Sequence, residues 1–188
     1  MNKLAQWVKI TPDGVEVNGE PLATSTHGVA LLTEVYRAHV NDYPKFFKMD
    51  ELGKLGFLAS ELLLQAEGNR QSDSEDRAVI LFGRHGSLST DRHYQTTIER
   101  TDDFFPSPSI FVYTLPNIVT GEIAIRNHYY GETAFYILER RDDQLIRETV
   151  EAAFLDGSTR SVLCGWVDCE SEDIFEAYIT LNIKESNK

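Results

Sequence analysis

Three short apolar runs, each bounded by turn-forming residues, restrict the folds open to this chain more than any other feature. They are RAVILFG (77–83), TAFYIL (133–138) and SVLCGWVD (161–168). Continuous apolar runs of this length are typical of strands that are buried on both faces of a sheet. Segments with helical spacing separate the runs. This alternation predicts an α/β fold in which helices cover both faces of a mostly parallel sheet.

Helical periodicity is clearest just before the first of these runs. Asp50 is suited to cap a helix and Gly68 to end it, and the apolar residues between them recur at helical spacing (Leu52, Leu55, Leu58, Ala59, Leu62, Leu63 and Ala66). Further helices are predicted at 90–100, capped by Thr90, and after Asn117, with three isoleucines facing the core (Ile118, Ile123 and Ile125). A fourth helix is expected at 142–155, between acidic capping residues and Gly157.

Alternating apolar and polar residues mark strands near both ends of the chain. Residues 7–19 alternate around Pro12-Asp13-Gly14, which predicts a hairpin, whereas residues 20–48 are expected to be irregular. The run 174–183 follows 161–168 after the loop CESED, which is too short for a parallel crossover. We therefore expect these two strands to be antiparallel, within one domain of residues 1–188 that contains a five-stranded mixed sheet.

Composition excludes several function classes. The 188 residues carry a formal net charge of −12, which argues against binding to nucleic acid or to an anionic membrane. No apolar stretch is long enough for a signal peptide or a membrane span, so we expect a cytoplasmic protein. The two cysteines form no disulfide framework; Cys164 is expected to be buried in a strand and Cys169 to be exposed at its end.

Four stretches, in order along the chain, together resemble the N-terminal half of β-ketoacyl-acyl-carrier-protein synthases (ketosynthases) of the thiolase-like superfamily. They are KFFKMDELGKLGFLASELLLQAEG, PSPSIFVYTLPNIVTGEIAIRNHYYGE, FLDGSTRSVLCGWVD and DIFEAYITLNIKE. The first is similar to the start of the family's first long helix, the second to its "SP…N…G.IA…G" segment, and the last two to its closing strands. The match covers about residues 45–186 and implies a thiolase-like half-domain.

The resemblance also locates the position of the family's nucleophile. In ketosynthases a Cys lies between a strand and a buried helix, where the helix N-terminus favours the thiolate. That position is nine residues after Gly131 and seventeen residues before Gly157, and both counts give Arg140. Arginine stays protonated at any useful pH, so Arg140 can be neither nucleophile nor general base. We also expect the second half of the family's fold, with its catalytic histidines, to be absent after Lys188.

Five side chains are candidates for binding. Arg140 and Arg141 could bind an anion such as a phosphopantetheine phosphate, or lie on a solvent-facing turn. His85, Asp91 and His93 could form an acid–base or metal cluster if the segment GRHGSLSTDRHY folds back, or belong to a solvated loop. Their spacing matches no metal motif, so we expect neither a metal nor a cofactor.

These features predict a catalytically inactive ketosynthase-like protein of fatty-acid, polyketide or aryl-polyene-type pigment biosynthesis. It would bind a partner ketosynthase, an acyl-carrier protein or its own copy. One alternative is a functional 3-oxoacyl-acyl-carrier-protein synthase subunit, an acyltransferase whose partner supplies the catalytic groups. Another is a small-molecule binding module that uses residues 83–94. The resemblance implies a homodimer paired through strand 133–138, and we expect an exposed apolar face where the second half would pack.

Overall fold

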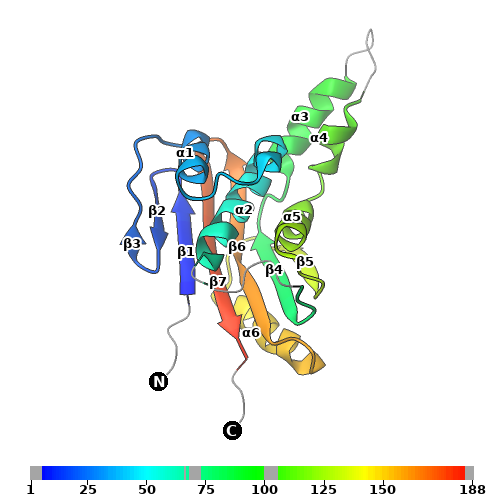
Figure 1. Ribbon diagram of the computed structural model, residues 1–188. Coiled ribbons are helices and arrows are strands. Elements are labelled where there is room, and N and C mark those ends of the chain that lie inside the picture. Colours follow the sequence, from blue (N-terminus) through cyan, green and yellow to red (C-terminus); the bar gives the residue numbers. More distant parts are fainter. Residues whose placement is uncertain (1–5, 66, 68–72, 100–105, 185–188) are drawn as a thin grey trace.

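The computed structural model describes residues 6–65, 67, 73–99 and 106–184, in which six α-helices and seven strands form a mixed α/β fold (Figure 1). The strands are β1 (Gln6–Thr11), β2 (Gly14–Val17), β3 (Glu20–Pro21), β4 (Arg77–Gly83), β5 (Thr133–Ile137), β6 (Ser161–Ser171) and β7 (Ile174–Ile183). The helices are α1 (Val29–His39), α2 (Glu51–Leu64), α3 (Leu88–Ile98), α4 (Pro108–Val112), α5 (Ile118–Asn127) and α6 (Asp143–Ala153), with 3₁₀ turns η1 (Pro44–Lys48) and η2 (Phe154–Asp156). No helix in these ranges combines the length and the apolar character needed to cross a membrane.

The strands form one sheet in the order β3-β2-β1-β7-β6-β4-β5. The antiparallel pairing of β6 with β7 confirms the prediction for the last two strands. The expected five strands and mostly parallel sheet are wrong, because only β4–β5 and β4–β6 are parallel. The N-terminal hairpin joins the same sheet when β1 pairs with β7, from Gln6 opposite Leu181 to Ile10 opposite Ala177. This pairing adds antiparallel strands to the predicted parallel ones.

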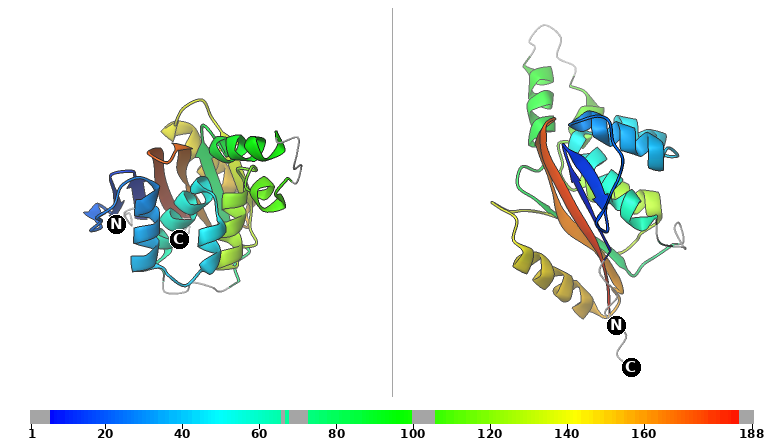
Figure 2. Two further views of the ribbon diagram at one scale, coloured as in Figure 1. Left: turned by 90° about the horizontal axis from the view of Figure 1, so that it is seen from above. Right: turned by 90° about the vertical axis from the view of Figure 1, so that its left-hand side faces the viewer.

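Helices cover both faces of the sheet, as predicted. The views in Figure 2 place α1, α2 and α5 on one face and α6 on the other. Helix α2 lies at the centre of its layer, where it contacts β1, β6 and β7 as well as α1 and α5. Leu55, Phe57 and Leu58 of α2 are fully buried, so this helix holds the larger of the two cores.

The second face of the sheet, which carries α6, has a mixed surface. Helix α6 covers the apolar residues of β4 and β6 there, which include Ile80, Phe82 and Trp166. Beyond α6 the same face over β1 and β7 is mixed, and its outward residues are Trp7, Lys9, Thr11, Ile174, Glu176, Tyr178, Thr180 and Asn182. Antiparallel strands can face water on one side when alternate residues are polar. The exposed residues of α6 are also largely polar or charged (Gln144, Arg147, Glu148 and Glu151).

Two further predictions about local structure are wrong. Residues 20–48 are not irregular, because they contain β3, α1 and η1. Helix α3 begins at Leu88 and not at Thr90, whose hydroxyl donates to a carboxylate on another helix, that of Asp50.

Helices α2 and α5 match their predicted positions but differ in detail. Asn117 precedes α5 without a side-chain capping bond, and Ile125 is 65% exposed instead of facing the core. Asp50 caps α2 as predicted, because its Oδ1 accepts a hydrogen bond from the N–H of Gly53. Helix α2 ends at Leu64, and Gly68 lies outside the described residues.

Candidate functional site

The strand–turn–helix at residues 133–153 contains the position that the resemblance assigns to a nucleophile. Strand β5 ends at Ile137 and α6 begins at Asp143, which confirms both predicted elements. Asp142 caps the helix, because its Oδ1 accepts hydrogen bonds of 3.0 Å from the N–H groups of Gln144 and Leu145. The turn between β5 and α6 is therefore well defined, and Arg140 lies two residues before the cap.

The two arginines of this turn have different surroundings. Arg140 is exposed and forms no hydrogen bond or ion pair with the described residues. Arg141 donates from Nε to Asp143 Oδ1 at 2.7 Å, and its guanidinium lies 4.6 Å from the centre of the Tyr178 ring. Tyr178 in turn stacks on Trp7 at 5.5 Å. Arg141 therefore fixes the turn against the Tyr178 ring on the sheet, whereas Arg140 remains accessible.

His85 forms a pair that the sequence did not suggest. Its Nδ1 lies 2.8 Å from Oδ2 of Asp168, and its Nε2 lies 3.9 Å from Oε2 of Glu170. The other oxygen of Asp168 accepts the backbone N–H groups of Arg84 and His85. Asp168 therefore holds both the imidazole and the loop that follows β4.

The predicted grouping of His85 with Asp91 and His93 is not found. Asp91 and His93 are exposed on α3, and no hydrogen bond or ion pair among the described residues joins them to His85. In that part of the chain no three His, Cys, Asp or Glu side chains are placed to hold a metal ion. The partner of His85 could be anticipated from topology, because the parallel strands β4 and β6 end at the same edge of the sheet.

Neither cysteine is suited to act as a nucleophile. Cys164 is buried as predicted, but Cys169 is also buried, at 2% exposure, because β6 continues to Ser171 and carries this side chain into the larger core. Burial raises the pKa of each thiol to about 12. Because the thiolate is the reactive form, both thiols are unreactive at neutral pH.

The buried carboxylate of Glu122 and the partly buried carboxylate of Asp50 connect the helices on the larger-core side of the sheet. Glu122 of α5 is 4% exposed, and its Oε1 accepts from Lys45 Nζ at 2.7 Å and from the Tyr113 hydroxyl at 3.1 Å. The Asp50 carboxylate joins the start of α2 to α3, through a bond of 2.8 Å from Thr90. Burial, which is only partly opposed by hydrogen bonds, raises the pKa of Asp50 to about 6.

We expect Asp50 to make the protein less stable at neutral than at mildly acidic pH. Its folded-state pKa is above the unfolded value, so folding is penalised while the carboxylate is charged. The penalty is fully present above pH 6 and is lost as pH falls toward the unfolded pKa. Between pH 7.5 and pH 5 the wild type should gain about 1.4 kcal/mol in free energy of unfolding relative to Asp50→Asn.

Urea denaturation at several pH values measures this difference. Asparagine caps helices as well as aspartate does, so the amide variant should fold. The exposed Asp91→Asn substitution is the matched control and should follow the wild type at every pH. Glu34 and Asp156, whose carboxyl pKa values are lowered to about 2 by hydrogen bonds, titrate below this range. Parallel pH profiles for the wild type and Asp50→Asn would contradict the expectation.

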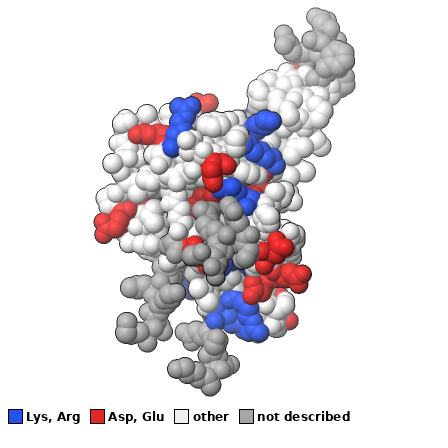
Figure 3. All heavy atoms as spheres, in the orientation of Figure 1, with Lys and Arg blue, Asp and Glu red and all other residues white. Residues whose placement is uncertain are grey.

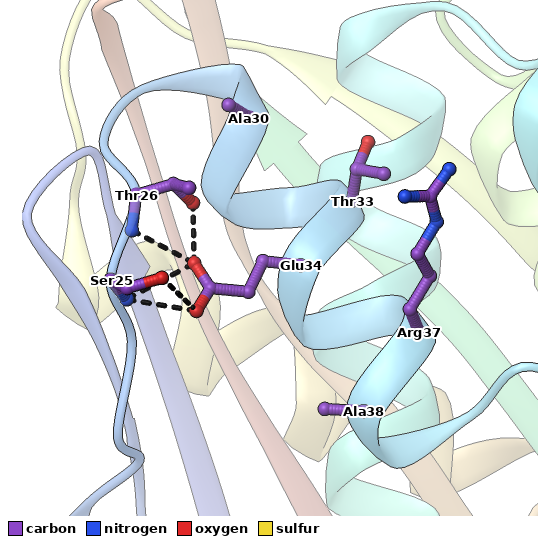
Figure 4. Close-up of a pocket in the computed structure, with 7 residues that line it drawn as sticks. All are labelled: Ser25, Thr26, Ala30, Thr33, Glu34, Arg37 and Ala38. Carbon is purple, nitrogen blue, oxygen red and sulfur yellow. Dashed lines mark hydrogen bonds between the residues drawn. The ribbon is translucent and has the colours of Figure 1, made fainter.

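A shallow hollow lies beside α1, where the loop before the helix passes over it. Its lining residues are Ser25, Thr26, Ala30, Thr33, Glu34, Arg37 and Ala38 (Figure 4). The Glu34 carboxylate points to the loop and is held by the backbone and hydroxyl groups of Ser25 and Thr26. Glu34 therefore fastens the loop and is not available to a ligand.

The surface offers no continuous basic region on the face shown in Figure 3. Among the described residues on this face, lysines and arginines are interspersed with aspartates and glutamates. This arrangement agrees with the acidic composition, because phosphate backbones require clustered basic side chains.

Comparisons with known proteins place this geometry in a known fold. No protein-family model matches the sequence, and no curated protein matches it. Among solved structures, the ishigamide ketosynthase/chain length factor matches with a TM-score of 0.70 and 18% identity, over 98% of this chain and 62% of that chain. The ketosynthase ApeO in complex with its chain length factor ApeC, from Xenorhabdus doucetiae, matches with a TM-score of 0.60 and 15% identity. The match covers 97% of this chain and 80% of that chain.

Two more distant matches have the same fold. The complex AntDE:AntF, a type II polyketide acyl-carrier protein with its ketosynthase, matches with a TM-score of 0.58 and 13% identity, over 96% of this chain and 63% of that chain. A β-ketoacyl synthase from Burkholderia phymatum matches with a TM-score of 0.54 and 14% identity. The match covers 78% of this chain and 46% of that chain. The chain thus has a ketosynthase-like thiolase fold and spans about three fifths of the first of these structures.

Proposed function

We propose that this chain is a non-catalytic ketosynthase-like subunit that acts by binding a partner ketosynthase. The pathway is of the fatty-acid, polyketide or aryl-polyene-pigment type. The observation that carries the proposal is the well-formed strand–turn–helix whose nucleophile position is Arg140. A guanidinium cannot attack an acyl group, and both cysteines are buried with raised pKa values. On this proposal the chain retains the strand–turn–helix that resembles the family's site but has no nucleophile in it.

A binding role is supported by the solved structures with this fold. Two of them contain a ketosynthase and a chain length factor, and a third contains a ketosynthase with its acyl-carrier protein. Proteins of this fold therefore form complexes with one another. In this chain the exposed Arg140 is free to contact an anionic group of a partner, such as a carrier-protein phosphate. An acyl-carrier protein is thus the second candidate partner.

The end of the sheet provides a surface through which such a partner can be bound. Strand β5 is the last strand in the order, and among the described residues it pairs only with β4. Exposed apolar side chains lie on this strand (Tyr136 and Ile137), and others lie on α4 and the turn that follows it (Phe111, Val112 and Leu115). An open apolar edge recruits another strand. We propose that a second copy of this chain, or the same edge of a ketosynthase, occupies it.

Co-expression tests the partner directly. The chain is produced with the ketosynthase encoded nearest to it and purified through a tag on one of the two proteins. We expect the two to elute together, and we expect Ile137→Lys to reduce the captured ketosynthase at least about tenfold because it places a charge in the apolar edge. Ile174→Lys, at an isoleucine of similar exposure on β7, is the matched control. Separate elution of the wild-type proteins would contradict the proposal.

A further inference from the structure

Among the described residues, His85 alone has a carboxylate beside each nitrogen of its ring. Its Nδ1 lies 2.8 Å from Asp168 Oδ2, and its Nε2 lies 3.9 Å from Glu170 Oε2. His27 and His128 each lie beside one carboxylate, at 3.2 Å and 3.1 Å, but both side chains are more than half exposed. In the described part of the chain neither of them has a second carboxylate partner. The arrangement around His85 is therefore more than a surface ion pair.

The backbone holds both carboxylates in place. Asp168 Oδ1 accepts the N–H groups of Arg84 and His85 at 2.9 Å and 2.8 Å, which leaves Oδ2 to the ring. Glu170 is skipped by the pairing of β6 with β7, where the register shifts, and such a bulge re-aims the side chain it carries. The side chains of His85 and Asp168 are mostly buried, whereas that of Glu170 is 48% exposed. The group is therefore open to solvent beside Glu170.

The contact with Asp168 determines which ring nitrogen carries the proton. A carboxylate only accepts hydrogen bonds, so the neutral imidazole bears its proton on Nδ1 and has a lone pair on Nε2. At 3.9 Å, Nε2 is too far from Glu170 Oε2 for a hydrogen bond. Two acceptors thus face each other across a gap that a cation can fill. Histidines that bind metal ions typically donate their other ring N–H to a carboxylate, as His85 does.

We propose that His85 Nε2 and Glu170 Oε2 bind a divalent transition-metal ion, and that Asp168 orients the ring for it. A nitrogen and an oxygen ligand together suit Zn²⁺, whose tetrahedral ligand atoms lie about 3.4 Å apart. The half-exposed Glu170 side chain would need to move by only about 0.5 Å to reach this spacing. Two protein ligands leave the other positions to water, which agrees with the lack of a third protein ligand in the described residues.

The site is independent of the β5 edge and of the proposed partner. It lies where the parallel strands β4 and β6 end, and an ion there would join the loop after β4 to the bulge of β6. The formal net charge of −12 also favours a cation over an anion at an open site.

Calorimetric titration of the purified chain with Zn²⁺ tests the site. We expect the wild type to bind the ion and both His85→Gln and Glu170→Gln to bind it at least about tenfold more weakly, because each lacks one ligand. Asp168→Asn should weaken binding about 10- to 100-fold, the usual effect of losing a group that orients a ligand. The matched control is His128→Gln, which removes a ring with a single carboxylate partner and should bind as the wild type does.

The variants also separate the site from other modes of zinc binding. Circular dichroism establishes that each is folded, and Glu170→Gln alters only a half-exposed side chain. No binding by the wild type at millimolar Zn²⁺ would overturn the proposal. Binding that survives His85→Gln would place the ion elsewhere, and binding unchanged in Glu170→Gln would show that the histidine acts alone; either result contradicts the site. Co-purification of the ketosynthase in the presence of a chelator judges the proposed function separately.

Discussion

Replacing Gly165 with alanine should lower the free energy of unfolding by about 3 kcal/mol, the upper end of the usual cost of overpacking a core. Gly165 lies in β6 opposite Ile179 of β7, and a β-carbon there would overlap the carbonyl oxygen of Tyr178 and the Cα of Ile179. These atoms belong to the backbone of the neighbouring strand. The overlap can be relieved only if the β6–β7 ladder at the centre of the sheet is distorted.

Urea denaturation compares this variant with Gly121→Ala. Gly121 lies in α5, and a β-carbon there would meet nothing within 4 Å. Alanine favours helix over glycine by about 1 kcal/mol, so the control should be as stable as the wild type or more stable. If Gly165→Ala does not fold, its loss in free energy of unfolding relative to Gly121→Ala is larger than about 3 kcal/mol, which also agrees with the expectation. Equal stability of the two variants would show that β6 and β7 are not packed as described.

The double substitution Phe135→Lys/Ile137→Lys should convert a dimer into a monomer. In light scattering at micromolar concentration we expect twice 21.3 kDa for the wild type and 21.3 kDa for the variant. Both substituted side chains lie on one face of the edge strand, and two-fold pairing would bring the four lysines of a dimer together. The like charges oppose pairing even though the backbone groups are unchanged.

The matched control for this experiment is Ile174→Lys/Ile183→Lys. These isoleucines are 59% and 57% exposed on β7, an interior strand of the sheet, and their substitution should leave the dimer intact. Circular dichroism establishes that both variants are folded. A folded edge variant that stays dimeric would contradict the use of β5.

Local sequence signals predicted much of this fold. The apolar runs became β4, β5 and β6, and Asp50 and Asp142 cap the predicted helices because their short acidic side chains reach the free N–H groups. Helix α1 was missed although Leu31, Leu32, Val35 and Tyr36 are buried at helical spacing. The residue before its first turn is Gly28, which provides no capping side chain, so the start of the helix carries no local signal.

Contacts between distant segments were harder to predict. Strand β1 pairs with β7 at the other end of the chain, which enlarged the sheet beyond the expected five strands. The bond between His85 and Asp168 spans 83 residues and depends on β4 and β6 being neighbours. Such pairings are set by strand order, which local periodicity does not specify. The position of Arg140 between a strand and a helix could be predicted, because that signal lies within about twenty residues.

The central claim is that this chain has the geometry of a ketosynthase site without its chemistry. It is tested most directly by the condensation of an acyl group with malonyl-acyl-carrier protein, using the purified chain alone. We expect the wild type to form no product above a control without protein. Arg140→Cys should also form none, because a thiol alone lacks the groups that decarboxylate the malonyl unit. Product formed by the wild type, from a preparation in which mass spectrometry finds no other ketosynthase, would contradict the account.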